Sequence, residues 1–520
     1  MSSIIERNRL KAFVWIKGKL VAQSAFLTQS YDNEIYDSIV LRDAAGRPYV
    51  PGTSLAGALR VRMQEAGTSD APPEVVEAMF GSEAREKAGS APSNDEGLQS
   101  ALIVNECYAL LEDGREQRIS IRDGIALSED ERTVAPRALY DYEVVEAGAA
   151  YELRLELIVR DGRHPAEQVA LLDRLVKTLL DDDLIVGAKG SRGLGRFRLE
   201  SPEVYVVKLS DDGARDAYRD FDWSTSAFSP WEEVGGIQKV LTDSENNTES
   251  TITPLPPCWD VVRYDIKVPG SLLIRDYRRP DLMADATMLT TTRYGKDEQA
   301  SNGSSKPVRY PLIPGTSWGG LLRGAVRRVL KDDFGLDASV CQALLARCFG
   351  ADYHEVKQKK SEALASGVLI DETVVKKCAY TGPIDVTRTA LDRFTGGVVA
   401  GHLFTDGVIV AVTAQLTVRY PRDDASRWMR QLVELALLDV DEGFAALGGE
   451  VSVGRGLVEV GSSAMSVRMD DKGNVTGVED LLEKIRELED EVRDLDKKHE
   501  LEKARESNSA PESEEAVAHG

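Results

Sequence analysis

The stretch RPYVPGTSLAGALR (residues 47–60) decides how this sequence is interpreted, because the chain nearly repeats it as YPLIPGTSWGGLLR (residues 310–323). In both copies a short apolar segment runs into Pro-Gly-Thr-Ser and then into a helical pattern that ends in arginine. Pro-Gly predicts a tight turn, and backbone N–H groups at the start of the helix after it can bind an anion. Suitable capping residues for these two helices are Thr53, Ser54, Thr316 and Ser317. One copy alone would be an ordinary capped helix; its repetition favours a function.

Other motifs recur in the same order along the chain. The offset is 263 residues between Pro51 and Pro314, 269 between Phe80 and Phe349, and 261 between Gly193 and Gly454. A nearly constant offset predicts two copies of one α+β domain. Strands with helices returned to one face suit a ferredoxin-like (RRM-like) βαββαβ core with insertions. The expected boundaries are a first domain at 8–207, an acidic insertion or linker at 208–257, a second domain at 258–466, and an acidic helical or disordered tail at 467–520.

Several local expectations follow from turn residues and periodicity. Asp123 and Gly124 predict a turn, residues 138–159 predict a hairpin closed by Ala147 and Gly148, and residues 403–418 predict a pair of strands. Apolar residues at heptad spacing predict either a single exposed helix or a coiled coil near the end of the chain. They are Val478, Leu481, Ile485, Leu488, Val492 and Leu495. Residues 507–520 are expected to be disordered.

Composition bounds the class of protein. With 520 residues, two or three domains are expected, and 42% hydrophobic with 29% charged residues is typical of a soluble globular protein. No segment has the length of a membrane span and the start lacks a signal peptide, so we expect a cytoplasmic protein whose five cysteines are reduced. The net charge of −23, taken alone, argues against nucleic-acid binding. However, residues 201–260 and 471–520 carry most of it, and arginines gather near the repeated motifs.

With these motifs the chain resembles the RAMP superfamily of CRISPR proteins, specifically the Cas seven-like backbone subunits of type III effector complexes. The resemblance rests on residues 37–60, 78–81, 138–148, 187–199, 312–327, 347–350, 392–397 and 447–460. Two such domains in one chain look like the double subunits of type III-D-like systems. The resemblance implies a subunit that lies along CRISPR RNA, helps form the groove where single-stranded target RNA pairs, and contacts other effector subunits.

The residue types near the repeats agree with RNA binding. The loop GAKGSRGLGR (residues 187–196) can bring main-chain N–H groups close to phosphates, and its basic side chains supply charge. Residues 454–456 offer a thinner version of the same loop. Plain hairpin loops and solvated helix charges are the alternatives. Besides the four capping residues, the candidates are Arg60, Lys189, Gly190, Ser191, Arg192, Gly193, Gly195, Arg196, Arg323, Gly454, Arg455 and Gly456.

Asp37 is the candidate catalytic residue. It lies fourteen residues before Pro51 in the context DSIVLRD, where the family's target-cleaving subunits carry an aspartate on a flexible loop. A carboxylate there could hold Mg²⁺ or Mn²⁺, or take the proton from an attacking 2′-hydroxyl. A turn-capping aspartate is the alternative, and Asp32 is the nearby rival. In the second half the nearest candidate is Asp297, with Asp285 further back, and this domain could bind RNA without cutting it.

Two other functions stay open. The first is a structural RNA scaffold in which neither domain cuts. The second is a nucleotide-using enzyme, although the glycine-rich loop lacks the Gly-Lys-Ser/Thr ending and the following helix of a Walker A motif. The five histidines are scattered and form no recognisable triad or metal pair, and His402 is expected to be buried, with a position facing the groove as the alternative.

Overall fold

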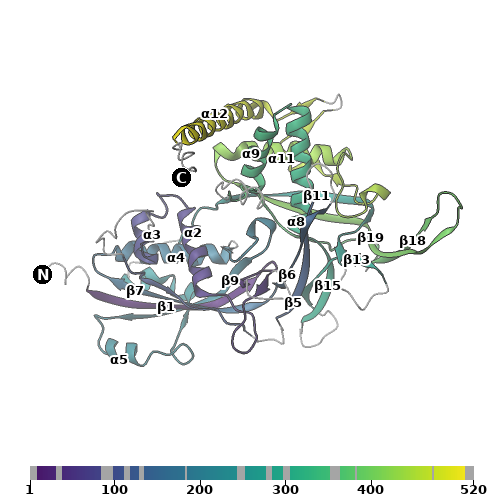
Figure 1. The fold of residues 1–520 in the computed structure, drawn as a ribbon. Coiled ribbons are helices and arrows are strands. Elements are labelled where there is room, and N and C mark those ends of the chain that lie inside the picture. The colour runs from purple at the N-terminus through teal and green to yellow at the C-terminus, as the bar shows by residue number, and fades with distance from the viewer. Residues whose placement is uncertain are drawn as a thin grey trace, which may run out of the picture.

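A computed structural model gives the fold in Figure 1. It describes residues 9–30, 38–82, 98–110, 117–127, 134–181, 184–242, 252–276, 284–296, 305–351, 364–380, 383–470 and 474–509. The described chain is a mixed α and β structure in two halves, each with its own hydrophobic core. No helix in these ranges is both long and apolar enough to cross a membrane. All five cysteines are free thiols.

The first half is built on an antiparallel sheet with the strand order β10-β9-β1-β7-β4, and β8 pairs with β9. Every second residue of β7 is buried, as expected for a strand with one face on a core. The elements of this half are β1 (Leu10–Ala22), β2 (Gln29–Ser30), β3 (Ile39–Val40), α2 (Gly52–Gln64), α3 (Pro73–Phe80), β4 (Leu102–Val104), β5 (Ile119–Leu127), β6 (Val134–Val145), β7 (Ala150–Arg160), α4 (Pro165–Asp181), β8 (Leu184–Ile185), the 3-10 helix η2 (Gly190–Arg192) and β9 (Arg196–Lys208).

The residues expected to form an acidic insertion or linker fold against the first half. They form α5 (Ala214–Arg219), β10 (Ser229–Pro230), α6 (Trp231–Val234) and α7 (Ile237–Thr242). The buried carboxylate of Asp173 in α4 accepts hydrogen bonds from the Trp231 indole and from the backbone N–H groups of Ile237 and Gln238. Burial nevertheless raises the pKa of Asp173. This carboxylate therefore fastens the segment to the domain that precedes it.

The second half repeats the core strand order, with β20-β11-β19-β16 in place of β9-β1-β7-β4. Its elements are β11 (Trp259–Leu272), β12 (Arg275–Asp276), β13 (Ala286–Met288), β14 (Thr290–Lys296), β15 (Ser305–Ile313), α8 (Gly315–Arg328), the π-helix η3 (Val329–Asp333), α9 (Ala338–Phe349), β16 (Leu369–Ile370), β17 (Thr373–Val374), β18 (Ile384–Leu391), β19 (Val398–Pro421), η4 (Asp424–Ser426), α11 (Arg427–Asp441), η5 (Val451–Val453), β20 (Glu459–Val460), η6 (Ser462–Ala464), β21 (Arg468–Met469), β22 (Val475–Thr476) and α12 (Glu479–Ser509).

Three local expectations about strands were wrong. Asp123 and Gly124 lie inside β5, where Gly124 leaves room for the ring of Tyr140 on the neighbouring strand. Ala147 and Gly148 do form a turn, but the strands it joins belong to different sheets: β6 pairs with β5, and β7 pairs with β1 and β4. Residues 403–418 lie within the single long strand β19, which pairs with both β11 and β18.

The heptad pattern marks the buried face of α12, which runs along α9 and α11 of its own chain (Figure 1). Leu481, Ile485, Leu488 and Val492 are all buried in the second core. Neither an exposed helix nor a coiled coil therefore describes this segment. The helix extends to Ser509, past the expected start of disorder at Ser507.

Candidate nucleic-acid interface

The glycine-rich loop of the first half has an unusual and well-anchored backbone. Lys189 has a positive φ of 60°, and the glycines at 187, 193 and 195 also have positive φ values, between 79° and 93°. The backbone N–H of Ala188 donates to Leu27 O at 2.9 Å, which fixes the loop beside the end of the strand region before β2. This geometry presents the side chains of Lys189 and Arg192 on one surface.

Lys189, Arg192, Tyr140 and Tyr142 form what we call the first basic patch. The Lys189 Nζ atom lies 4.6 Å from the ring centroid of Tyr140 and 4.5 Å from that of Tyr142. The exposed Arg192 donates to the Tyr140 hydroxyl at 3.4 Å. Burial, with a smaller contribution from the charge of Arg192, lowers the pKa of Lys189 to about 8. The patch combines cationic and aromatic groups, which single-stranded RNA binds through phosphates and bases.

The base of the predicted catalytic loop lies against this patch. Ser38 forms a parallel bridge with Tyr142, and the Gln29 side-chain amide donates to the Ser38 hydroxyl at 2.8 Å. Glu143 accepts the backbone N–H of Val40 at 3.1 Å and pairs with the Arg42 guanidinium. Both ends of the loop are therefore held beside the tyrosines of β6. The predicted catalytic residues Asp37, Asp32 and Asp297 lie outside the described residues.

The second glycine-rich loop has the backbone of the first but different side chains. Positive φ values recur at Gly448, Glu450, Gly454 and Gly456, at the same spacing as in residues 187–195. Glu450 occupies the position of Lys189, so this surface lacks the equivalent lysine. Arg455, predicted to bind RNA, is buried and pairs with Glu450 at 2.9 Å and with Asp406 at 3.6 Å. Its charge is used inside the domain rather than presented to a phosphate.

The two helix starts differ from the expected capping. Both α2 and α8 begin at the glycine of the motif, with Pro51 and Pro314 at the N-cap position and no side-chain cap. The four hydroxyl residues therefore lie within the first helical turn. The physical reason is close packing: Gly52 lies against the carbonyl oxygen of Val104. Thr53 is exposed, whereas Ser54, Thr316 and Ser317 are partly buried.

The first glycine-rich loop covers the start of α8. A methyl group added at Gly315 would overlap the carbonyl oxygen of Arg192, and one added at Gly193 would overlap the backbone nitrogen of Glu372. The first glycine-rich loop and the Pro-Gly helix start of α8, both predicted to bind RNA, therefore pack against each other. The main-chain groups of Gly193 and of the start of α8 lie at the contact between the two halves. The motif in the first half, at α2, has no loop of this kind against Gly52 in the described chain.

Buried charges also join the halves. Arg122 of β5, which is only 3% exposed, pairs with Glu372 at 2.8 Å and with Glu146 at 3.7 Å. The Arg196 guanidinium, predicted to bind RNA, lies 3.1 Å from Asp371 of the second half. Arg293 of β14 donates to Gln23 O at 2.8 Å. These pairs are costly to break once buried, because a lone buried charge is left behind.

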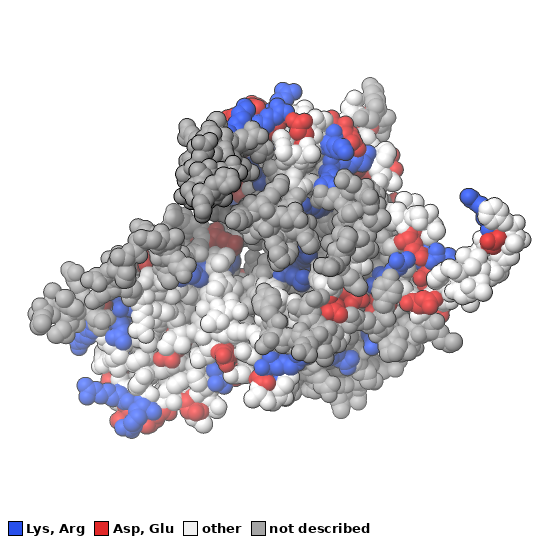
Figure 2. Space-filling model, viewed as in Figure 1, with Lys and Arg blue, Asp and Glu red and all other residues white. Residues whose placement is uncertain are grey.

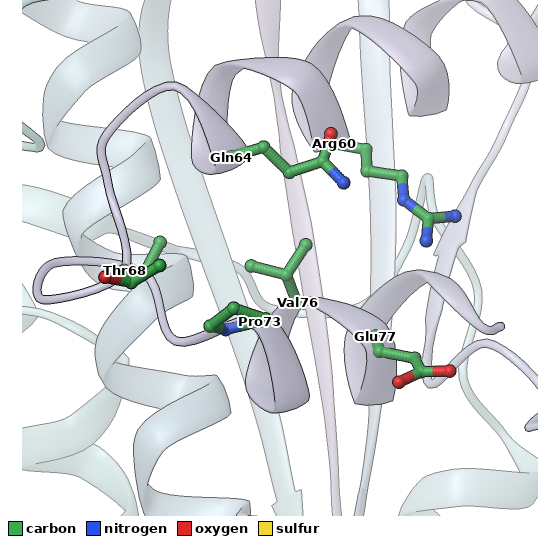
Figure 3. A pocket seen from close by; sticks show the side chains of 7 residues that line it. Arg60, Gln64, Thr68, Pro73, Val76 and Glu77 are labelled. Atoms are coloured by element: carbon green, nitrogen blue, oxygen red, sulfur yellow. The ribbon is translucent and has the colours of Figure 1, made fainter. Parts of the chain in front are cut away.

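Arg60 and Arg323, at equivalent positions of α2 and α8, have different surroundings. Arg60 lines a cavity of about 300 Å³ between α2 and α3, together with Gln64, Thr68, Val76 and Glu77 (Figure 3). Arg323 donates to the carbonyl oxygen of Gly350 at the end of α9, at 3.1 Å. Arg323 therefore donates a hydrogen bond to a carbonyl at the C-terminus of α9, whereas Arg60 lines a cavity that Glu77 also lines.

The turn at residues 392–397, part of the family resemblance, closes a projecting arm formed by β18 and the first part of β19, and the sequence analysis did not predict this arm (Figure 1). Its residues are mostly uncharged (Figure 2), and Phe394 at its turn is 93% exposed. His402, expected to be buried, is exposed beside Phe404. Other exposed apolar residues of the arm are Leu391, Val398 and Leu403. The apolar runs at residues 398–400 and 403–404, next to the exposed turn, could have indicated this surface.

Metal ligands are sparse in the described chain. No group of three or more His, Cys, Asp or Glu within the described residues could hold a metal ion.

Comparison with known proteins identifies one family. A family model described as the RAMP superfamily matches residues 14–198 and 301–459, more than half of the chain. The two matched regions contain both Pro-Gly helix starts and both glycine-rich loops. A search of curated proteins returns no match.

Proposed function

The chain belongs to the RAMP superfamily, whose members are CRISPR-associated RNA-binding subunits, and we propose that it is a double Cas seven-like backbone subunit of a type III effector complex. In this proposal each half is a ferredoxin-like domain that contacts successive segments of one CRISPR RNA. The repeated core strand order supports two copies of one domain. The type III-D-like assignment rests on the fusion of two such domains in one chain.

The observation that carries the proposal is the first basic patch. Lys189 and Arg192 would bind the RNA backbone, and the partly buried ring of Tyr140 can stack on a base, supported from behind by the buried ring of Tyr142. The apolar arm with Phe394 at its turn would insert between neighbouring bases, since stacking on an exposed ring does not depend on base identity. Target RNA paired to the guide would then pass the loop that contains Asp37.

We further propose that Asp37 makes one cut in the target RNA with Mg²⁺ or Mn²⁺. Magnesium commonly binds one or two carboxylates and substrate phosphates while keeping several waters, so one aspartate with an RNA phosphate is a suitable donor set. A cation bound there would stabilise the negative charge that develops on the attacked phosphate. Asp37 would position the RNA 2′-hydroxyl and accept its proton, and Lys189 and Arg192 would orient the backbone for in-line attack.

The test is target-RNA cleavage by the assembled complex with Mg²⁺ or Mn²⁺, comparing wild type with Asp37→Ala and the matched control Asp32→Ala. Asp37→Ala should lose one discrete cut by at least about 100-fold while it still binds RNA. Asp32→Ala should keep that cut. An unchanged cleavage pattern in Asp37→Ala would show that this domain is a non-catalytic scaffold, the alternative function.

Partner subunits form a second part of the proposal. Within the chain, the first glycine-rich loop packs on a Pro-Gly helix start, but its counterpart Gly454 has no atom of the described chain within 4 Å of an added methyl group. Beside it, Val451, Val453 and Leu457 are exposed. We propose that this loop packs on the Pro-Gly helix start of a different RAMP-fold subunit with an apolar surface. The repeated interface within the chain supports this occupant.

A further inference from the structure

We propose that Asp285, rather than Asp297, is the carboxylate with which the second domain cuts RNA. The inference rests on the proposed function, and it adds a second active site to the same chain. It is carried by two independent strand registers and by the surroundings of Asp285. Both registers involve residues that the structure describes.

The first register comes from two short antiparallel ladders. Strands β2 and β3 pair Gln29 with Val40, and β12 and β13 pair Arg275 with Met288. Each ladder directly follows the leucine that packs against its own glycine-rich loop, Leu27 in one half and Leu273 in the other. The next backbone hydrogen bond after each ladder also connects equivalent positions: Leu41 N donates to Thr28 O, and Leu289 N donates to Ile274 O. This register places Ala286 at the position of Ser38.

The second register comes from the neighbouring strand. Ser38 forms a parallel bridge with Tyr142, and Ala286 is a parallel partner of Asp406. Tyr142 and Asp406 are also equivalent. Each lies three residues before a residue, Val145 or Ile409, that pairs with the chain at or just after the end of the first strand of its half, β1 or β11. Those two pairs are Phe26 with Val145 and Leu272 with Ile409. Ala286 again corresponds to Ser38, and the residue before it, Asp285, corresponds to Asp37.

Asp297 belongs to a different part of the repeat. It follows β14, and the β14–β15 hairpin corresponds to the tight turn at residues 43–47 of the first half. The hydrogen bonds that close these two segments are equivalent: Tyr49 N donates to Leu41 O, and Leu312 N donates to Leu289 O. Counting back from Pro314 selects Asp297 only because this hairpin is longer than its counterpart.

Asp285 is placed to act on RNA. It is exposed, and its Oδ2 atom accepts the backbone N–H of Thr405 at 2.8 Å, which anchors the carboxylate at the edge of β19. Cationic side chains lie on the strands that pair with β13 and β19. Arg275 of β12 and Arg388 of β18 are each more than a third exposed and both pair with Glu450.

Charge near Asp285 therefore comes from different positions than in the first domain. Three arginines, the third being Arg455, face the two carboxylates of Asp406 and Glu450, so this cluster carries one more positive than negative charge. In the first half the glycine-rich loop itself supplies the cations. The replacement of Lys189 by Glu450 is thus offset by Arg275 and Arg388, which stand at the positions of Gln29 and Gly124.

The reaction balances without any oxidant or reductant. The RNA 2′-oxygen attacks the adjacent phosphorus, and its proton passes to the Asp285 carboxylate. The bond from phosphorus to the 5′-oxygen breaks, and that oxygen takes a proton from water. The products are a 2′,3′-cyclic phosphate and a 5′-hydroxyl end, and the carboxylate returns its proton to solvent.

The experiment maps cuts in target RNA made by the assembled complex in Mg²⁺, with wild type, Asp37→Ala, Asp285→Asn and Asp297→Asn. The Asp285→Asn variant keeps an oxygen that can accept the Thr405 N–H, so the fold should be retained. Melting temperature and target affinity check this. We expect two cuts in wild type, loss of one by at least about 100-fold in Asp37→Ala, loss of the other in Asp285→Asn, and both cuts in Asp297→Asn.

The outcomes separate the inference from the proposed function. If Asp37→Ala loses a cut but Asp285→Asn keeps every cut, or if Asp297→Asn loses the second cut, the inference is wrong and the proposed first site stands. Loss of a cut in Asp285→Asn alone supports the second site and removes the first. Neither site survives if both variants cut as wild type does.

Discussion

Lys189 is the residue at which burial and RNA binding oppose each other. Its pKa of about 8 is below the ordinary value of a lysine because burial disfavours the charged form. A bound phosphate favours that form, so RNA binding above pH 8 requires proton uptake. Affinity for CRISPR RNA should therefore fall as pH rises through 8, on the order of tenfold between pH 7 and pH 9. A filter-binding or fluorescence titration at constant ionic strength measures this.

The matched control for Lys189 is Lys189→Arg, whose charge persists over the same pH range. Its affinity should change much less between pH 7 and pH 9. The same lysine should oppose folding at neutral pH: with a lowered pKa in the folded state, its contribution to the free energy of unfolding rises as pH increases from 8 toward 10.5. An equal pH dependence in wild type and Lys189→Arg would assign the effect to another group.

For single residues, the sequence indicates which side chains can bind RNA better than it indicates which residues lie beside them in the fold. The glycine-rich loop marks Lys189 and Arg192 as candidates, and both lie on one surface. The tyrosines that complete the patch come from β6, and only the strand pairing brings them there. Asp285 was passed over for a similar reason, because counting along the chain assumes equal loop lengths and the β14–β15 hairpin breaks that assumption.

The two glycine-rich loops offer a matched test at the scale of elements. Gly193 and Gly454 have nearly the same φ, 84° and 83°, so alanine should cost each about 1 kcal/mol in backbone strain. Only at Gly193 would the added methyl group overlap the second half, at the backbone of Glu372. We expect Gly193→Ala to lower the free energy of unfolding by about a further 1–3 kcal/mol, measured by chemical denaturation. Equal losses in the two variants would contradict the observed packing.

Helix α12 contributes to the second core through one face. Ile485 is 2% exposed, whereas Leu482, one residue after the buried Leu481 and outside the buried row, is 45% exposed. We therefore expect Ile485→Ala to destabilise the second domain by about 2–5 kcal/mol, because it leaves a cavity against α9 and α11. Leu482→Ala should change stability by less than about 0.5 kcal/mol. Hydrogen exchange over α9 and α12 reports which element opens, and equal protection in the two variants would count against this packing.

Element identity was easier to predict than element pairing. The 3.5-residue spacing in α12 correctly marked an apolar helix face, but periodicity is the same whether the partner is another chain or the helix's own domain. The same holds for β6, whose alternating residues predict a strand without specifying its neighbour. The Asp-Gly turn signal failed at residues 123–124, because glycine there accommodates the ring of Tyr140 rather than a reversal of the chain.

For the whole molecule, the near-constant motif offset predicted duplication, and the core strand order recurs in the two halves, but the offset could not show how the halves pack. The chain joins them by a heterologous contact, in which the loop of one copy lies on the helix start of the next. Such an interface leaves an unused half at each end of the molecule and can continue into longer assemblies unless side chains prevent it. The side chains at the two ends therefore decide whether this subunit associates with itself.

Gly52 packs on Val104 O as Gly315 packs on Ile370 O, so Asn105 corresponds to Asp371. The 261-residue offset between the glycine-rich loops makes Leu457 correspond to Arg196. Self-association through the same interface would therefore place Leu457 of one copy opposite Asn105 of the next. Within the chain these two positions hold Arg196 and Asp371, whose charged groups lie 3.1 Å apart. The wild-type ends lack this pair, so the protein should not form long chains of its own copies, and its free loop should select a different subunit.

Restoring the pair tests this selection directly. The double variant Leu457→Arg with Asn105→Asp should form oligomers whose mass rises with concentration in sedimentation velocity and falls with added salt, because a partly buried ion pair is rebuilt. Each single variant should sediment as wild type does, since one charge without its partner is unfavourable at a buried contact. A double variant that stays at the wild-type mass, or a wild type that already forms such oligomers, would show that the second glycine-rich loop does not use the interface seen within the chain.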